Sequence, residues 1–153
     1  MMHPTPHARQ PLCLLPGLLC DRALWAHQIE NLSDIADCTV ADLTRADSMG
    51  ALAEAVLAHA PDRFALAGLS MGGYVAFEIL RRAPERVTRL CLVDTSARPD
   101  TLEQRQRREA MLKLARIGKF RGMSPRLLST QVHPDHVAVP EIGGVVLAMT
   151  ERV

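Results

Sequence analysis

Short apolar runs alternate with segments of helical periodicity over the first two thirds of the chain. Four of these runs predict β-strands, at residues 12–15, 35–40, 64–67 and 87–93. The last run is almost uninterrupted, which is typical of a parallel strand covered on both faces. Proline and glycine punctuate the segments between the strands, as expected for loops and helix ends.

The intervening segments predict three helices. Asp21 is expected to cap the first, Asp47 or Ser48 the second, and Pro84 is expected to end the third, which covers residues 73–83. The second helix is expected to end at Pro61 and Asp62. The first two helices place apolar residues on one face: Leu24, Trp25, Ile29 and Leu32 in the first, and Met49, Leu52, Val56 and Ala60 in the second.

Four strands joined by three helices predict an α/β fold with a doubly wound parallel sheet, because each parallel connection needs a helix between its strands. Beyond Asp94 the pattern becomes helical. The expected segments run to about Phe120, over residues 125–130, and from Pro140 to the end. Asp100 and Glu103 fit a capping box at the start of this region. No further strand is expected.

Composition excludes several classes of protein. The chain has 153 residues, 48% hydrophobic and 23% charged, which is the range of one folded domain and not of a disordered chain. No apolar run reaches the roughly 20 residues of a membrane helix. The net charge is +1, so we expect neither a nucleic-acid nor a membrane partner.

Basic residues gather in the middle of the chain. Residues 81–126 carry thirteen Lys and Arg against five acidic residues, and the densest group lies in a predicted helix at Arg105, Arg107 and Arg108. A solvated helix face explains this better than an anion-steering patch.

The four cysteines predict reduced thiols. Cys13, Cys38 and Cys91 fall in predicted strands and are expected to be mostly buried, Cys20 falls in a loop, and none has C-x-x-C spacing. The apolar segment ending at Cys20 fails as a secretory signal, because proline and glycine interrupt it and a bulky leucine precedes the cysteine. We therefore expect a cytoplasmic protein.

The sequence Gly-Leu-Ser-Met-Gly at residues 68–72 follows the third predicted strand and opens the third predicted helix. This G-x-S-x-G pattern predicts a nucleophile elbow, a sharp turn that exposes the hydroxyl of Ser70. Gly68, Gly72 and Gly73 lack a Cβ, so the strand and the helix can approach closely. The alternative is an ordinary turn in which Ser70 caps the helix.

Three stretches resemble the α/β-hydrolase family, specifically its small serine esterase-like members. They are residues 14–19 (LLPGLL), 68–73 (GLSMGG) and 92–96 (LVDTS). The resemblance implies that Ser70 is the nucleophile and that the backbone N–H groups of Leu18 and Met71 form an oxyanion hole, with no metal or cofactor. Pro16 stands where many relatives have histidine, which spares the backbone donor.

The resemblance also implies a reaction class and a division of the chain. A serine nucleophile implies an acyl-enzyme formed from a small ester, thioester or related carbonyl substrate. Residues 1–98 would form the N-terminal half of the core, and residues 99–153 a helical cap cut off within a helix. Five apolar residues either line the underside of this cap or simply pack on the sheet: Leu102, Met111, Leu112, Leu114 and Ile117.

The general base is the missing element. The family places its histidine, and usually its acid, beyond the point where this chain stops, so we expect a truncated chain that is inactive alone. Asp94 is a candidate acid or, alternatively, a turn-capping residue bonded to Ser96. His133 and His136 are candidate bases or ordinary exposed loop residues, and with one carboxylate they are too few to hold zinc.

The other histidines are weaker candidates for the base. His27 and His59 lie on helices remote from the elbow, and His3 and His7 near the N-terminus. The competing hypothesis is a catalytically inactive remnant that acts as a binding or interaction module. In either case an uncovered strand at residues 87–93 would favour self-association through the sheet edge.

Overall fold

A computed structural model describes residues 8–119, 122 and 125–153 of the chain. These residues divide into two compact units, with the boundary between Ser96 and Ala97. The first unit is an α/β layer and the second contains only helices.

The first unit is built on four parallel strands in the order β2-β1-β3-β4. They are β1 (Gln10–Leu15), β2 (Ala36–Val40), β3 (Phe64–Leu69) and β4 (Val87–Val93). The predicted fold class, a doubly wound parallel sheet, is confirmed. All four predicted strands are present, and the last has the predicted bounds.

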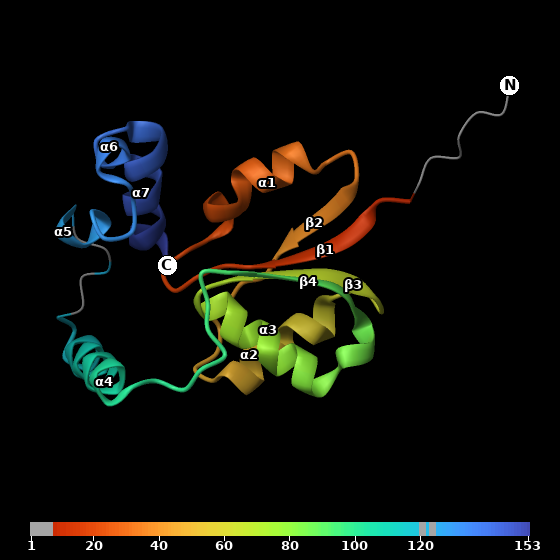
Figure 1. The fold of residues 1–153 in the computed structure, drawn as a ribbon, viewed down its shortest axis with the longest axis horizontal. Helices are drawn as coiled ribbons and strands as arrows, with labels where there is room; N and C mark the ends of the chain where they lie inside the picture. The colour runs from red at the N-terminus through yellow and green to blue at the C-terminus, as the bar shows by residue number, and fades with distance from the viewer. Residues whose placement is uncertain (1–7, 120–121, 123–124) are drawn as a thin grey trace, which may run out of the picture. The chain divides into compact units, whose positions relative to one another are not determined.

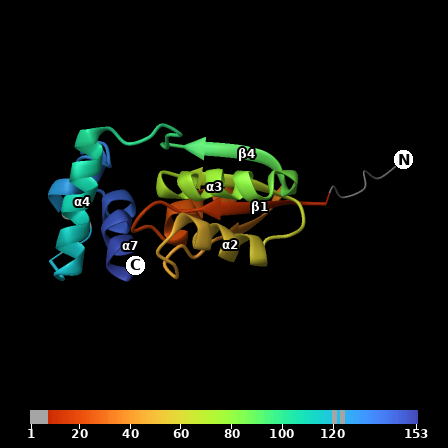
Figure 2. The same cartoon turned by 90° about the horizontal axis from the view of Figure 1, so that it is seen from below.

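Helices cover the two faces of the sheet separately (Figures 1 and 2). The short helix α1 (Ala26–Asn31) lies on one face, and α2 (Met49–His59) and α3 (Met71–Arg82) lie on the other. Alternation along β1 divides its side chains between the two cores: Leu14 packs with Trp25 and Ala67, whereas Cys13 and Leu15 join the larger cluster with α2 and α3.

Two of the predicted helix starts are present, with differences in detail. Asp21 caps as expected by accepting from the N–H of Ala23 at 2.8 Å, but the segment is a 3₁₀ turn, η1 (Arg22–Trp25), followed by α1. At α2 the cap is Ser48, whose hydroxyl accepts from the N–H of Ala51 at 3.2 Å. Met49, expected to face inward, is 38% exposed.

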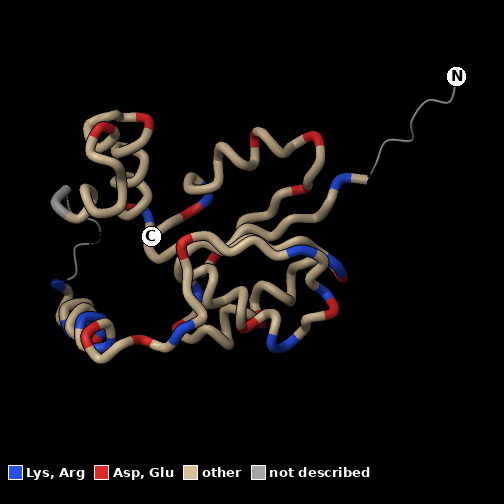
Figure 3. Tube along the Cα trace, viewed as in Figure 1, with Lys and Arg blue, Asp and Glu red and all other residues tan. Residues whose placement is uncertain are grey.

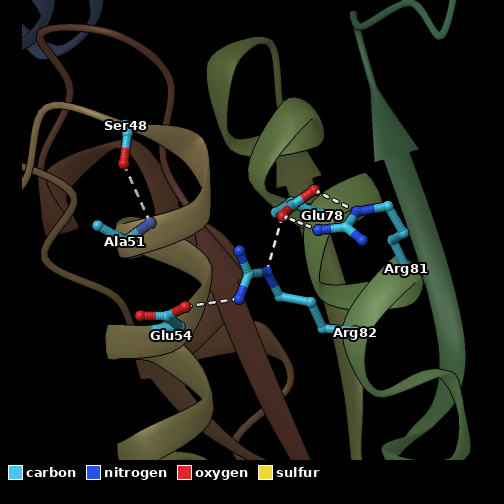
Figure 4. A network of polar contacts seen from close by, with 6 residues as sticks. All are labelled: Ser48, Ala51, Glu54, Glu78, Arg81 and Arg82. Carbon is cyan, nitrogen blue, oxygen red and sulfur yellow. Dashed lines mark hydrogen bonds and ion pairs between the residues drawn. The ribbon is translucent and has the colours of Figure 1, made fainter.

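A polar network joins α2 to α3 on the solvent side (Figure 4). Arg82 donates to Glu78 on its own helix at 2.7 Å and to Glu54 on α2 at 2.6 Å, while Arg81 also binds Glu78. Hydrogen bonds from both arginines lower the pKa of Glu78 to about 2.

Arg86, at the end of the 3₁₀ turn η2 (Pro84–Arg86), forms hydrogen bonds with the C-terminal end of α2 and the residues that follow it. Its guanidinium donates to four backbone carbonyls, those of Leu57, Ala60, Pro61 and Asp62, at 3.0, 2.8, 2.8 and 3.2 Å. It also lies 5.7 Å from the centre of the Phe64 ring. Of these carbonyls, that of Leu57 belongs to the last turn of α2, where carbonyls have no partner within the helix.

Strand β4 is the edge of the sheet and is exposed along most of its length. Leu90, Leu92 and Val93 are 42%, 39% and 36% exposed. The expectation that both faces of this strand are covered is therefore wrong, and the expected uncovered edge is present. The apolar sequence of β4 predicts burial, but in this structure the strand is exposed.

The second unit contains α4 (Leu102–Arg116), α5 (Pro125–Leu128), α6 (Pro134–Val137), a π-helical turn η3 (Pro140–Gly144) and α7 (Val145–Arg152). Leu128 and Met149 are buried within it. The predicted capping box is displaced by one residue: Thr101 and Gln104 form it. The reason is that the Asp100 carboxylate pairs with Arg108 at 2.9 Å.

Helix α4 has no buried residue among those described. The five apolar side chains expected to form an underside or to pack on the sheet are all exposed: Leu102, Met111, Leu112, Leu114 and Ile117. Basic residues recur along the same helix (Figure 3), and Arg107 pairs with Glu103 at 3.1 Å. This pair and the pair between Arg108 and Asp100 agree with a solvated helix face.

All four cysteines are free, as predicted. Only Cys13 is buried, however; Cys20 and Cys38 are half-buried and Cys91, on the edge strand, is exposed. Over the described ranges, no helix combines the length and apolar character needed to cross a membrane.

Candidate active site

Ser70 is the single residue between the end of β3 at Leu69 and the start of α3 at Met71. Its backbone has φ 51° and ψ −112°, a conformation that residues with a side chain rarely adopt. Such strain costs on the order of 1–3 kcal/mol and persists only where the surroundings enforce it. The predicted sharp turn from strand to helix is present.

The hydroxyl of Ser70 does not cap α3, so the alternative of an ordinary N-cap is wrong. The main chain of Ser70 is instead held on both sides. Its N–H donates to the carbonyl of Val93 at 3.0 Å, and its carbonyl accepts from the N–H of Gly73 at 3.0 Å and from the hydroxyl of Thr95 at 2.9 Å. Within the described part of the chain, Ser70 Oγ has no hydrogen-bond partner and is available for chemistry.

The elbow requires glycine because backbone and side chains fill the space where a Cβ would lie. A Cβ on Gly68 would lie 2.5 Å from the carbonyl oxygen of Gly72. One on Gly72 would overlap the carbonyl of Leu15, and one on Gly73 would overlap the side chain of Thr95. The first turn of α3 thus packs directly on the ends of β1 and β4.

The order of the strands makes this edge of the sheet a natural binding position. From β1 the chain passes to β2 on one side, and β3 then pairs with β1 on the other, so the loops after β1 and β3 diverge at a topological switch point. Leu15 pairs with Gly68, and Leu69 pairs with Val93, so all three strands end level. Ligands of open α/β sheets bind at this position.

The loop after β1 lies against the elbow. A Cβ on Gly17 would lie 3.0 Å from Leu69, and the N–H of Cys20 closes a turn onto the carbonyl of Gly17 at 3.2 Å. Within this turn Leu19 has φ 59°, and Leu18 is 57% exposed. The structure therefore places the two expected oxyanion donors at the same edge of the sheet, Leu18 in the loop after β1 and Met71 at the start of α3.

Cys20 lies in this loop, with its Sγ 3.5 Å from the carbonyl oxygen of Leu18. Burial raises the pKa of Cys20, and the charge of Asp21 raises it further. The thiol is therefore held protonated at neutral pH, and a protonated thiol is a poor nucleophile.

Asp94, the candidate acid, directly follows β4. It is exposed and has φ 43°, so after Leu19 and Ser70 it is the third residue with positive φ at this sheet edge. Across the described residues, neither Asp94 nor Ser70 makes a hydrogen bond to a histidine. Asp94 directly follows Val93, whose carbonyl accepts from the N–H of Ser70.

The candidate histidines are dispersed. His27 lies on α1, and on α2 the Nδ1 of His59 lies 2.8 Å from the carbonyl of Ala55. His133 and His136 belong to the second unit, where their rings are 5.8 Å apart. His3 and His7 lie outside the described residues.

His133 has a local structural role that the sequence did not suggest. Its Nδ1 accepts from the N–H of Asp135 at 3.4 Å and so caps α6, a helix in a segment expected to be a loop. Over the ranges that the structure describes, no group of three or more metal-ligating side chains is assembled.

Thr95 is the contact residue that sequence reasoning did not assign. It follows Asp94 in a loop, where its type carries no specific signal. Only the fold brings its hydroxyl to the carbonyl of Ser70 and its whole side chain against Gly73.

This chain matches only part of the length of its curated relatives. A pimeloyl-[acyl-carrier protein] methyl ester esterase from Vibrio campbellii is 33% identical over 126 residues, covering 77% of this chain and 44% of the relative. A protein of the same description from Vibrio parahaemolyticus is 29% identical with the same coverage. The chain thus spans less than half the length of these relatives.

Solved structures share the fold. A thermophilic esterase from Thermogutta terrifontis has 27% identity and a TM-score of 0.64, covering 94% of this chain and 64% of that one. The enol-lactonase from Burkholderia xenovorans LB400 has 21% identity and a TM-score of 0.71, covering 96% and 60%, and shows the fold alone.

The family assignment rests on the sequence match together with the fold. A family model described as the thioesterase domain matches residues 33–137, well over half of the chain, and this range contains the elbow, β3 and β4. The chain belongs to the thioesterase domain family and has the α/β-hydrolase fold.

Proposed function

We propose that this chain carries the nucleophile of a serine esterase that cleaves a small carboxylic ester, thioester or related carbonyl substrate through an acyl-enzyme. The observation that carries the proposal is Ser70, whose backbone is strained and whose hydroxyl is unengaged at the switch point of the sheet. The names of the relatives support it, since those proteins are described as methyl ester esterases.

The first chemical step would join Ser70 Oγ to the carbonyl carbon of the substrate. The hydroxyl proton passes to a general base, and the carbonyl π electrons move onto oxygen to give a tetrahedral oxyanion. Collapse of this intermediate re-forms the carbonyl and expels the alcohol or thiol, which takes the proton back from the base. Water then hydrolyses the acyl-enzyme by the same sequence, and the acid and Ser70 are released.

Backbone N–H groups would stabilise the oxyanion. Met71 is the first residue of α3, so its N–H lacks an intrahelical acceptor and points out of the positive end of the helix dipole. We assign the second donor to Leu18, whose loop lies against the elbow. Loss of one such donor lowers kcat by roughly 10²–10³ in serine proteases, so the pair accounts for much of the expected rate.

The base and the acid would complete the site. Asp94 is the proposed acid, because it follows β4 next to the elbow. No described histidine is bonded to Ser70, so we expect residues 1–153 alone to show no turnover of short-chain p-nitrophenyl esters. We propose no cofactor or metal, and a cytoplasmic location stays a prediction.

Labelling with a fluorophosphonate tests the nucleophile without requiring turnover. One phosphonylation forms the Oγ–P bond, expels fluoride and can release the proton to solvent, so slow labelling is expected at Ser70. Ser70→Ala should abolish it. Ser33→Ala is the matched control, because the Ser33 hydroxyl only donates to the carbonyl of Glu30 at 2.8 Å on the surface.

The competing function is a binding or interaction module without catalysis. The exposed β4 edge favours it, as does the absence of a histidine bonded to Ser70 among the described residues. An unlabelled chain with a native fluorescence spectrum from Trp25 would support this alternative. Ester hydrolysis that survives both His133→Ala and His136→Ala would instead contradict the inference that this chain lacks its base.

A further inference from the structure

We propose that Thr95 is a positioning residue for the oxyanion hole: by holding the carbonyl of Ser70, it aims the backbone N–H of Met71. This inference rests on the proposed function and adds a residue to which neither the motif nor the resemblance gives a role. Thr95 does not bind Ser70 Oγ, so its action is through the main chain.

The argument begins with the planarity of the peptide bond. The carbonyl of Ser70 and the N–H of Met71 belong to one peptide unit, and in a trans peptide they point in opposite directions. No peptide bond among the described residues is cis. Whatever fixes the direction of the Ser70 carbonyl therefore fixes the direction of the Met71 donor.

Two hydrogen bonds fix that carbonyl. The N–H of Gly73 reaches it at 3.0 Å from within the first turn of α3, and the Thr95 hydroxyl reaches it at 2.9 Å from the loop after β4. The bond from Gly73 is local to the elbow. The bond from Thr95 comes from outside the elbow, so it fixes the orientation of the Ser70–Met71 peptide relative to the sheet.

The strain at Ser70 explains why a hydrogen bond from outside the elbow is needed. With φ 51° and ψ −112°, the residue would relax by rotating its peptide units if its contacts were weakened. Its N–H is held by Val93, on the same strand that leads to Thr95. The end of β4 and the loop that follows it thus hold the two peptide units that flank Ser70, one through Val93 and the other through Thr95.

The side chain of Thr95 also packs against the first turn of α3, through its hydroxyl oxygen and its methyl group alike. It fills the space that Gly73 leaves by lacking a Cβ. Positioning and packing can still be separated by substitution. Thr95→Val keeps the shape and removes the hydroxyl, Thr95→Ser keeps the hydroxyl and removes the methyl group, and Thr95→Ala removes both.

Two measurements on the full chain test the proposal. In the first, the rate of fluorophosphonate labelling is resolved into the maximal rate and the half-saturating concentration. A positioning role predicts a maximal rate about tenfold lower in Thr95→Val, an unchanged half-saturating concentration, and a nearly normal rate in Thr95→Ser. A packing role predicts the reverse order, with Thr95→Val normal and Thr95→Ser slow, and would overturn the proposal.

The second measurement does not depend on reactivity. In ¹⁵N-labelled chain, the amide of Met71 should shift and lose order in Thr95→Val while remaining unchanged in Thr95→Ser. An unchanged Met71 amide in Thr95→Val overturns the positioning role even if Ser70 is never labelled, whereas absence of labelling in the parent chain contradicts only the proposed function. If Thr95→Val does not fold, Thr95→Ala against Thr95→Ser gives the same comparison.

The matched control is Thr130→Val. The Thr130 hydroxyl also donates to a backbone carbonyl, that of Leu127 at 2.7 Å, but it does so in the second unit. Its removal should leave the labelling rate and the Met71 amide unchanged. A similar loss in this variant would show that the effect of Thr95→Val is not specific to the elbow.

Discussion

Replacing Arg86 with alanine should destabilise the first unit more than any other change of a half-exposed charged residue. The guanidinium holds four carbonyls at the end of α2, which packs against the elbow helix α3 through the main core. Alanine removes all four hydrogen bonds at once.

The size of the loss follows from the burial of the four acceptors. The bonds to Leu57 and Ala60 are partly buried and contribute about 1.5 kcal/mol each, the value for a charged donor. The two bonds to Pro61 and Asp62 are exposed, so water replaces them at little cost. The contact with the Phe64 ring adds about 0.5 kcal/mol. The expected loss is about 3.5 kcal/mol, a large part of the stability of a typical domain.

Urea unfolding followed by fluorescence measures this loss. Trp25 is the one tryptophan of the chain and is 6% exposed in the core of the first unit, so its emission reports this unit. Arg86→Lys should lose about half as much, because an ammonium cannot reach all four carbonyls. Arg81→Ala, at a side chain that is 67% exposed, is the control and should change the free energy by less than about 0.5 kcal/mol.

The reasoning is refuted if Arg86→Ala unfolds with the same free energy and the same slope as the parent chain. Equal losses in Arg86→Ala and Arg81→Ala would also contradict it, since the effect would then be one of general charge. A loss confined to Arg86→Ala and Arg86→Lys, in that order, is the expected result.

Three further predictions concern pH, the elbow and association. The folded pKa of Glu78 is about 2 against an ordinary 4.5, so its ion pairs stabilise the fold above pH 4.5 and are lost as the pH falls toward 2. In Glu78→Gln the urea midpoint should therefore depend less on pH between pH 5 and 2. The same pH dependence in the variant and the parent chain would contradict this. Gly72→Ala forces a Cβ into the carbonyl of Leu15 and should slow fluorophosphonate labelling at least tenfold, whereas Gly144→Ala, with its nearest neighbour at 3.9 Å, should not. The exposed β4 edge should make the chain self-associate in light scattering, Leu90→Lys should reduce this, and a monodisperse parent chain would refute it.

The strands and the elbow could be predicted because their signals are local. Strand β4 matched its predicted bounds since an apolar run between Pro84 and Asp94 admits few other structures. Ser70 was found because glycines on both sides meet a steric need of the turn itself. Both are properties of a few consecutive residues.

Contacts between distant segments could not be predicted. Asp100 fits a capping box as well as Thr101 does, and only its ion pair with Arg108 decides between them. The roles of Arg86 and Thr95 depend on carbonyls about 25 positions away, which no pattern within a helix or strand encodes. The same limit applies to the burial of β4, because sequence indicates a preference for burial and not whether a neighbour is present.

The hydrogen bonds that hold Ser70 in its strained conformation come from the strand with the least cover. Edge strands exchange their amide hydrogens through local opening, at a lower free energy than unfolding of the whole unit. When the end of β4 opens, Val93 and Thr95 release Ser70 together, and the peptide that carries the Met71 donor is free to rotate. Reactivity at Ser70 should therefore disappear under mild denaturing conditions in which Trp25 still reports a folded core.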